Sequence, residues 1–261
     1  SKDLTHYQER APQNAVYAKS ARRYVAGPEF QPVFLDPDPD AYLMRLRSMA
    51  EGFADAGANW LAAPPDMDIA LTLRRKVDTE VLRSVLAAVR EERSLDLHYQ
   101  SMNRDRPDPA WRRITPHAFG FDGLRWHVRA WCHETERFKD FLLSRVLGFG
   151  EFGEPGAAAA QDRLWQETYD ITLVPHPDLS VGQQAVVAKD YNMADGRAVL
   201  TVRYAMLFYV LKRLGLLDGA RLRDPRTQHI VAADEDEVAA ALERAQQEFD
   251  EADVASGAAP R

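Results

Sequence analysis

Cationic and titratable side chains alternate along one short stretch of the chain, at Arg125, His127 and Arg129. On a β-strand, residues two apart point to the same face, and their side chains recur about every 6.6 Å. That repeat is of the order of the spacing between phosphates in an extended single strand. The stretch therefore predicts a strand with an anion-binding face, opposite to Trp126 and Val128, which we expect in the core.

Further arginines and flat rings lie near this stretch. Guanidinium groups hold phosphates and aromatic rings stack on bases, so the combination favours binding of a nucleic acid or nucleotide. A second interpretation stays open: Arg125 and Arg129 pair with carboxylates on a solvated sheet face, where an ion pair contributes only about 0 to 1 kcal/mol. The cationic and aromatic residues are Arg112, Arg113, Arg145, Tyr99, Trp111, Phe119 and Trp131, and the carboxylates are Asp122, Glu134, Glu136 and Asp140.

The sequence lacks the motifs that are typical of enzymes. It contains no HExxH, no CxxC, no Gly-x-Ser-x-Gly elbow and no glycine-rich loop ending in Lys-Ser or Lys-Thr. The single cysteine, Cys132, is expected in the core. A nuclease with His127 as general base is the best enzyme alternative, but no paired carboxylates for a metal accompany it. We therefore expect no catalytic residue, no metal site and no cofactor.

Composition limits the other classes of protein. The 261 residues are 46% hydrophobic and 28% charged, with a net charge of -7, so any contact with nucleic acid must be local. One cysteine excludes an internal disulfide and suits a reducing cytosol. No apolar run approaches the length of a membrane span, and the N-terminus lacks a signal-peptide pattern. We expect a cytoplasmic globular protein with no membrane partner.

The elements that would position these residues begin with a hairpin and a helix. Two β-prone runs, 15–17 and 23–26, are separated by a short polar turn. Asp38 or Asp40 would cap an amphipathic helix, and its apolar stripe, within 42–53, is expected to pack in a core.

A second helix and a small β unit follow. A short strand is expected at 69–73, and Asp78 would cap a helix with one apolar side. From 94 to about 150 the apolar period changes to two, with short turns between the runs, which predicts a compact barrel or a strongly bent sheet. The apolar side of the helix comprises Val81, Leu82, Val85, Leu86 and Val89.

Beyond a Gly- and Ala-rich link at 150–162 the pattern is mixed α/β. Strands are expected at 169–174 and 198–203, and helices at 180–188 and 204–217. The last helix is apolar around most of its circumference, so it needs burial on more than one side. We expect it in or beside a dimer interface, and burial within its own domain is the alternative.

The stretch from 97 to 148 resembles a WYL domain. RWHVRAWC, preceded by WRRITPHAF and followed by FKDFLLSR, is similar to the WYL regulators attached to BREX and CBASS phage-defence islands, the BrxR and CapW group. The Trp-Tyr-Leu signature stands here as Trp126-His127-Val128, so the resemblance depends on the flanking pattern. It implies an Sm-like β-barrel that senses a nucleic-acid fragment or nucleotide. The pocket residues that it implies are Tyr99, Ser101, Arg112, His117, Arg125, His127, Arg129 and Arg145.

The resemblance extends to the first residues of the chain. Residues 1–34 look like the second half of that group's winged helix-turn-helix, with the hairpin as the wing, although composition alone would class them as an ordinary solvated helix end and hairpin. The chain opens without methionine on a helical pattern already in progress, which we interpret as a truncation. The implied contacts with double-stranded operator DNA are Lys2, Thr5, Lys19, Arg22 and Arg23.

Residues from 169 to about 250 resemble the C-terminal extension that helps WYL proteins to form dimers, and a two-fold dimer suits a palindromic operator. We therefore expect a homodimeric, ligand-responsive repressor of a phage-defence operon with an α+β fold: a partial winged helix, a small Sm- or SH3-like barrel and an α/β dimerisation domain. The alternative is a stand-alone module that binds single-stranded nucleic acid, or signals, without controlling transcription. The expected parts are 1–35 (partial winged helix), 36–92 (helical linker region), 93–150 (barrel), 163–250 (dimerisation domain) and 251–261 (tail).

Overall fold

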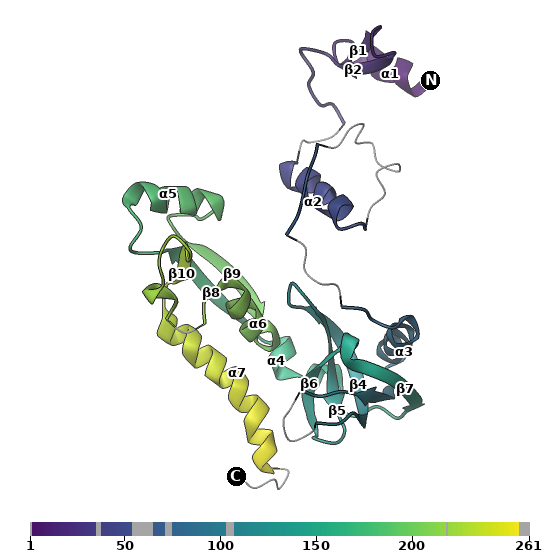
Figure 1. Cartoon of the computed structure of the whole chain (residues 1–261), viewed down its shortest axis with the longest axis vertical. Coiled ribbons are helices and arrows are strands. Elements are labelled where there is room, and N and C mark those ends of the chain that lie inside the picture. The colour runs from purple at the N-terminus through teal and green to yellow at the C-terminus, as the bar shows by residue number, and fades with distance from the viewer. Residues whose placement is uncertain are drawn as a thin grey trace. The chain divides into compact units, whose positions relative to one another are not determined.

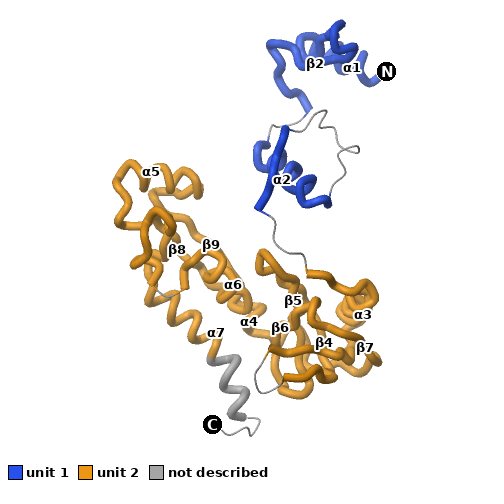
Figure 2. The backbone as a smooth tube through the Cα atoms, in the orientation of Figure 1, with its two compact units in different colours: residues 1–73 blue, residues 74–261 orange. Residues whose placement is uncertain are grey.

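The computed structural model describes residues 2–34, 38–53, 65–70, 75–102, 107–217 and 219–255. The chain divides into two compact units, residues 1–73 and 74–261 (Figure 2). Both units combine helices with antiparallel strands (Figure 1), so the predicted α+β class is confirmed. None of the described helices is long and apolar enough to cross a membrane.

The first unit joins a short helix to a β-hairpin. Asn14 fastens the two: its side-chain amide donates to the Tyr7 hydroxyl at 2.9 Å, and its side-chain oxygen accepts from the backbone N–H of Gln31 at 3.0 Å. The predicted hairpin is therefore present and tied to the helix before it. The elements of this unit are α1 Lys2–Arg10, β1 Ala15–Ala18, β2 Arg23–Ala26 and α2 Pro39–Ala50.

Helix α2 begins where the sequence predicts. Asp38 is its cap, and the carboxylate accepts from the backbone N–H of Asp40 at 2.9 Å. The expectation that its apolar stripe packs in a core is wrong for the residues that the structure describes, because none in α2 is buried and Leu43, a member of the stripe, is 58% exposed. The strand expected at 69–73 is also absent from its described part, 69–70, and its remainder lies outside the described residues.

The second unit begins with a helix packed on a five-stranded antiparallel sheet of order β6-β5-β4-β3-β7. Asp78 caps α3 as predicted, and Val81 and Val85 enter the core of the sheet, whereas Leu86 is 42% exposed. Register shifts in the β3–β7 and β4–β5 pairs interrupt the regular ladder and favour bending. The elements are α3 Thr79–Arg90, β3 Ser94–Tyr99, β4 Ala110–Phe121, β5 Trp126–Cys132, β6 Arg137–Leu142 and β7 Val146–Gly153.

A three-stranded antiparallel sheet of order β10-β8-β9 follows, with α6 against it and α7 beside α6 (Figure 1). The strand predicted at 198–203 is confirmed as β9. The helix predicted at 204–217 ends earlier, because Gly215 adopts a φ of 69° and stops it. Strand β10 has no counterpart among the predicted elements. The elements are α4 Arg163–Gln166, β8 Thr168–Pro175, α5 Val181–Asp190, β9 Ala198–Arg203, α6 Tyr204–Leu214, β10 Ile230–Ala232 and α7 Glu235–Ala255.

Helix α6 is buried on two sides within its own chain. Leu207 and Leu211, both at most 1% exposed, pack in the core of the C-terminal sheet. On another side Met206 reaches β4 so closely that a Cβ on Gly120 would lie 2.8 Å from the methionine sulfur. These contacts account for most of the apolar circumference, while Phe208 stays 39% exposed.

Candidate ligand pocket and the junction beside it

A cavity of about 400 Å³ opens on the five-stranded sheet, which we call the barrel, and three cations contribute to its wall. Arg112 comes from β4, Lys139 from β6, and Arg145 from the single 3₁₀ turn that precedes β7. Tyr99 and Ser101, at the end of β3 and just beyond it, add hydroxyl groups. We call this cavity the pocket; its lining includes Tyr99, Ser101, Arg112, Lys139, Asp140 and Arg145.

Cations outnumber carboxylates at the pocket. Arg112 forms an ion pair with Glu134, and its side chain is only 10% exposed. Among the described residues that line the pocket, Asp140 is the carboxylate, and Arg112, Lys139 and Arg145 are the cations. The Tyr99 hydroxyl accepts a hydrogen bond from the backbone N–H of Leu142 at 3.2 Å, so its own O–H stays oriented toward other acceptors. The arrangement suits an anion that also accepts hydrogen bonds.

Strand β5 does not present the cationic face that alternation predicted. His127, Val128, Arg129 and Ala130 are all at most 3% exposed, whereas Trp126, expected in the core, is 52% exposed. The physical reason is that β5 is covered on both faces: the barrel core lies on one side, and residues of the C-terminal part lie on the other. Alternation assigns residues to faces but does not say which faces meet water.

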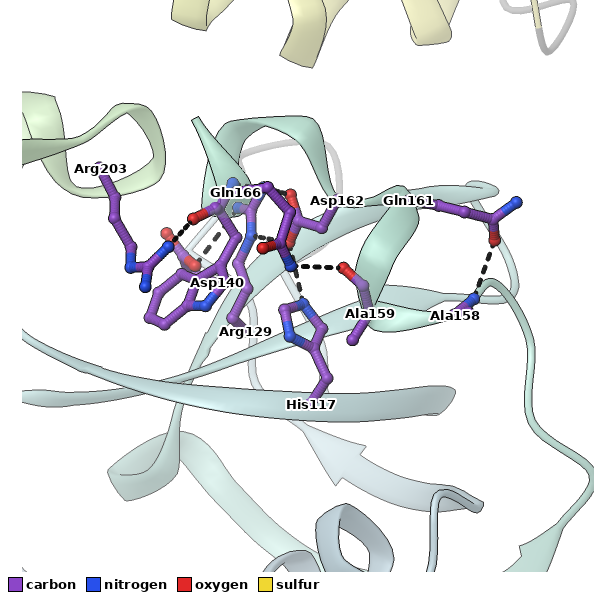
Figure 3. Close-up of polar contacts among 10 residues, drawn as sticks. His117, Arg129, Asp140, Ala158, Ala159, Gln161, Asp162, Gln166 and Arg203 are labelled. Atoms are coloured by element: carbon purple, nitrogen blue, oxygen red, sulfur yellow. Dashed lines mark hydrogen bonds and ion pairs between the residues drawn. The ribbon is translucent and has the colours of Figure 1, made fainter. Parts of the chain in front are cut away.

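Arg129 is held in a buried ion pair with Asp162. Its Nε and Nη2 donate to the two carboxylate oxygens at 2.8 and 3.0 Å, and both side chains are 1% exposed (Figure 3). His117 Nε2 lies 2.9 Å from the same carboxylate, which also caps α4 by accepting from the backbone N–H of Trp165. Burial raises the pKa of Asp162, but the hydrogen bonds from His117 and Arg129 outweigh it and hold that pKa below its ordinary value.

A second carboxylate, Asp122, contacts two neighbouring basic side chains, Arg125 and His127. It accepts from Nε of Arg125 at 2.6 Å and lies 3.0 Å from Nε2 of His127. Burial raises the pKa of Asp122, yet the hydrogen bonds from His127, from Arg125 and from two backbone N–H groups outweigh burial and leave it well below its usual range. The interpretation that these arginines pair with nearby carboxylates therefore holds for Arg125.

Asp140 connects this cluster to α6. Its Oδ1 lies 3.4 Å from Nη1 of Arg129, and its Oδ2 accepts from the Tyr209 hydroxyl at 3.1 Å. The Tyr209 ring packs on His127 with 4.6 Å between centroids. Burial, followed by the charge of Asp140, raises the pKa of Tyr209 above its ordinary value, so the hydroxyl remains a donor. We call this set the junction; it comprises His117, Asp122, Arg125, His127, Arg129, Asp140, Asp162 and Tyr209.

The eight residues expected at the ligand site fall into two groups. Half of them line the pocket, namely Tyr99, Ser101, Arg112 and Arg145. The other half belong to the junction and are engaged with carboxylates, namely His117, Arg125, His127 and Arg129.

Lys139, Asp162 and Tyr209 were not among the residues predicted for these sites, and Asp140 was expected only as a partner for an arginine. Lys139 and Asp140 reach the pocket only because β6 pairs beside β5, which no single-strand pattern reveals. Asp162 stands in a segment interpreted as a linker, although an aspartate before a short helical run is a cap signal. Cys132, by contrast, is buried in the barrel core as predicted, and among the described residues no group of three or more His, Cys, Asp or Glu could hold a metal.

The residues expected to contact DNA lie in the first unit, and all are exposed. Two stand on α1, and three stand at or beside the turn of the hairpin, where Arg22 adopts a φ of 50°. Their exposure leaves the side chains accessible to a phosphate backbone. They are Lys2, Thr5, Lys19, Arg22 and Arg23.

The order of a hairpin-bearing helical unit, a barrel with a cationic pocket and an α/β part is that of a WYL-type transcriptional regulator. Along the chain, residues 1–48 match the BrxR transcriptional regulator winged helix-turn-helix domain, 80–149 the WYL domain, and 168–238 the BrxR transcriptional regulator C-terminal dimerization domain.

Relatives named DNA-binding transcriptional repressor CapW match over most of the chain. The protein of Stenotrophomonas maltophilia is 37% identical over 239 residues, 91% of this chain and 79% of its own length. Those of Escherichia coli strain KTE188 and Pseudomonas aeruginosa are 34% and 30% identical, covering 94% and 91% of this chain and 81% and 79% of their own. The chain therefore belongs to the BrxR/CapW family of WYL-domain regulators, as the resemblance predicted, and this is a family of regulators and not of enzymes.

Proposed function

We propose that the chain acts as a homodimeric DNA-binding repressor of a phage-defence operon, and that its barrel senses a nucleic-acid fragment or nucleotide. The relatives named as DNA-binding transcriptional repressors support repression through DNA binding, and the resemblance to regulators of BREX and CBASS islands is what favours a phage-defence operon. The match of residues 168–238 to a dimerization domain supports the dimer. The observation that carries the sensing role is the pocket, where three cations and the hydroxyl groups of Tyr99, Ser101 and Thr135 line one cavity.

The chemistry of the pocket selects a phosphorylated ligand of modest size. Guanidinium forks bind phosphate oxygens in pairs, and an ammonium adds a point charge, so Arg112, Arg145 and Lys139 together suit a phosphate. A cavity of about 400 Å³ falls within the usual range for small-molecule sites. We therefore expect a nucleotide, or the end of a short oligonucleotide, in preference to a long strand.

Ligand binding would act through the shape of the dimer. A two-fold dimer reads two half-sites at a fixed spacing, so a ligand that prefers one arrangement of the subunits changes the affinity for the operator. The exposed α1 and hairpin supply the surface that contacts DNA in this proposal.

The sensing role is tested by titrating 5′-phosphorylated single-stranded oligonucleotides and nucleotides into the wild-type protein and Arg145→Ala. We expect Arg145→Ala to weaken binding about tenfold or more, with a shallower salt dependence, because one charged contact is lost. The control is Arg83→Ala, which removes an exposed arginine of α3 and should bind as wild type does. Equal binding by Arg145→Ala and wild type would contradict the assignment of the pocket.

The DNA-binding role is tested with DNA from the chain's own promoter. Replacing Arg22 and Arg23 by alanine should reduce affinity about uniformly across sequences and lower the salt slope by about two, one for each phosphate contact. If the wild-type protein shows no preference for the promoter but binds single strands, the stand-alone module is the better description.

A further inference from the structure

Asp140 belongs both to the pocket and to the junction. Its carboxylate lines the cavity and is 11% exposed, so a bound molecule can reach it. From the other side it accepts the hydrogen bond of Tyr209, which stands on α6. Among the described residues, Asp140 therefore lines the pocket and also accepts a hydrogen bond from α6, the helix that packs on the C-terminal sheet.

The contacts of Asp140 are weaker than those beside it. Arg129 and Asp162 form two short, well-aligned bonds and are 1% exposed, which fixes both side chains. Asp140 instead reaches Arg129 at 3.4 Å and Tyr209 at 3.1 Å. Because long contacts at the edge of water are the easiest to exchange, Asp140 can reorient while the Arg129–Asp162 pair stays in place.

Space beside α6 leaves room for such a change. A second cavity, of about 240 Å³, is lined by Asp140, Phe208, Tyr209 and Leu242, among others, and so separates α6 and α7 from the barrel at this point. A side chain next to an unfilled volume shifts at lower cost than one in a close-packed core. Tyr209 therefore has somewhere to move when its acceptor turns.

We propose that Asp140 is the positioning residue that communicates occupancy of the pocket to α6. The proposal rests on the sensing function proposed above. An anionic group held by Lys139 and Arg145 repels the Asp140 carboxylate, which turns toward Arg129 and gives up its bond to Tyr209. Since α6 lies within the part that matches a dimerization domain, its displacement changes how two subunits fit together.

The test uses the full chain, DNA from its own promoter and a 5′-phosphorylated single-stranded hexanucleotide as probe. Tyr209→Phe removes only the hydroxyl, and Asp140→Asn keeps the shape while removing the charge that the probe would repel. Tyr204→Phe is the matched control, because it makes the same substitution on the same helix, at a residue that lines the same second cavity but whose hydroxyl accepts from Arg244 and does not bond to Asp140. Three quantities are measured: probe affinity, promoter affinity with and without probe, and hydrogen exchange of the 204–214 amides.

We expect Tyr209→Phe to bind the probe within about twofold of wild type, and Asp140→Asn to bind it more tightly, because the repelling charge in the pocket wall is gone. In both variants the effect of the probe on promoter affinity should fall about fivefold or more. Their α6 amides should no longer respond to the probe, and Tyr204→Phe should respond as wild type does. A purely structural role would shift basal exchange without abolishing the response.

Three results would overturn the proposal. If the promoter affinity of both variants responds to the probe as in wild type, the pocket binds the ligand but Asp140 does not communicate its occupancy to α6. If the variants lose the probe itself, Asp140 and Tyr209 shape the pocket and do not communicate its occupancy. If the wild-type protein binds no probe at all, the sensing function fails first and the coupling fails with it.

Discussion

In the junction, Arg129 and Asp162 are each 1% exposed, and two short bonds join a barrel strand to the residue that caps α4. In the pocket, Arg145 is only partly buried and faces a cavity of about 400 Å³. The two arginines belong to one barrel, and both were expected to bind the same ligand. Burial beside a carboxylate makes the first a structural group, whereas the cavity leaves the second able to exchange water for an anion.

This difference in burial determines how much a substitution at Arg129 or at Arg145 should change the stability of the fold. Removing one partner of a buried pair leaves an uncompensated charge, which costs far more than the pair itself contributes. Removing a cation from a solvated wall leaves only water in its place. Stability measurements therefore separate Arg129 from Arg145 without knowledge of the ligand.

The largest effect is expected for Arg129→Met. The variant leaves the Asp162 carboxylate buried with His117 alone, and we expect the free energy of unfolding to fall by about 3 to 5 kcal/mol. Urea denaturation followed by circular dichroism measures it. The double variant Arg129→Met with Asp162→Leu removes both charges and should be less damaging than the single one. A loss below about 1 kcal/mol for Arg129→Met would mean that the junction is no more than a surface ion pair.

A smaller and gradual loss of stability is expected on acidification. The pKa of Asp162 in the folded state lies below its value of about 3.9 in the unfolded state. At a pH between these two pKa values, the unfolded state therefore binds more protons than the folded state. The stabilisation is complete above the unfolded pKa and is lost as the pH falls through the folded pKa. The stability difference between wild type and Asp162→Asn should therefore narrow below about pH 4. Denaturation curves between pH 7 and pH 2.5 measure it, and a constant difference would assign the loss to packing and not to charge.

The smallest effects are expected for the solvated arginines. Arg113 pairs with Asp96 at 2.8 and 2.7 Å, but its side chain is 40% exposed, so Arg113→Ala should cost no more than about 1 kcal/mol. Arg145→Ala should change stability by about 0.5 kcal/mol or less while it weakens ligand binding. If Arg145→Ala destabilises the fold as much as Arg129→Met, the distinction between pocket and junction is wrong.

Local signals in the sequence were sufficient for many elements. Asp38 and Asp78 cap α2 and α3 as predicted, because an aspartate before a helix satisfies backbone N–H groups whatever surrounds it. The hairpin and β9 follow in the same way from β-prone runs with clear ends. These predictions succeed because neighbours in the chain decide them.

The site could be predicted only in part, because its geometry depends on residues far apart in sequence. Tyr99 and Arg145 meet through the pairing of β3 with β7, and the resemblance to WYL domains was what placed both at a pocket. The structural role of Arg129 could not be predicted without knowing that it pairs with Asp162, which is 33 residues away and lies in a Gly- and Ala-rich segment. The alternation of apolar residues shows that a strand has two faces. Whether the second face is exposed to solvent depends on which other part of the chain packs on it.

The Arg129–Asp162 bond also bears on where this chain can be cut. A fragment ending at the last barrel strand, at Gly153, would keep the arginine and lose its counterion, and a graft of the C-terminal part that starts after Asp162 would lose the cap of α4 as well. Chimaeras that exchange sensor barrels between relatives should therefore carry the segment through α4 along with the barrel, even though its composition resembles a dispensable spacer.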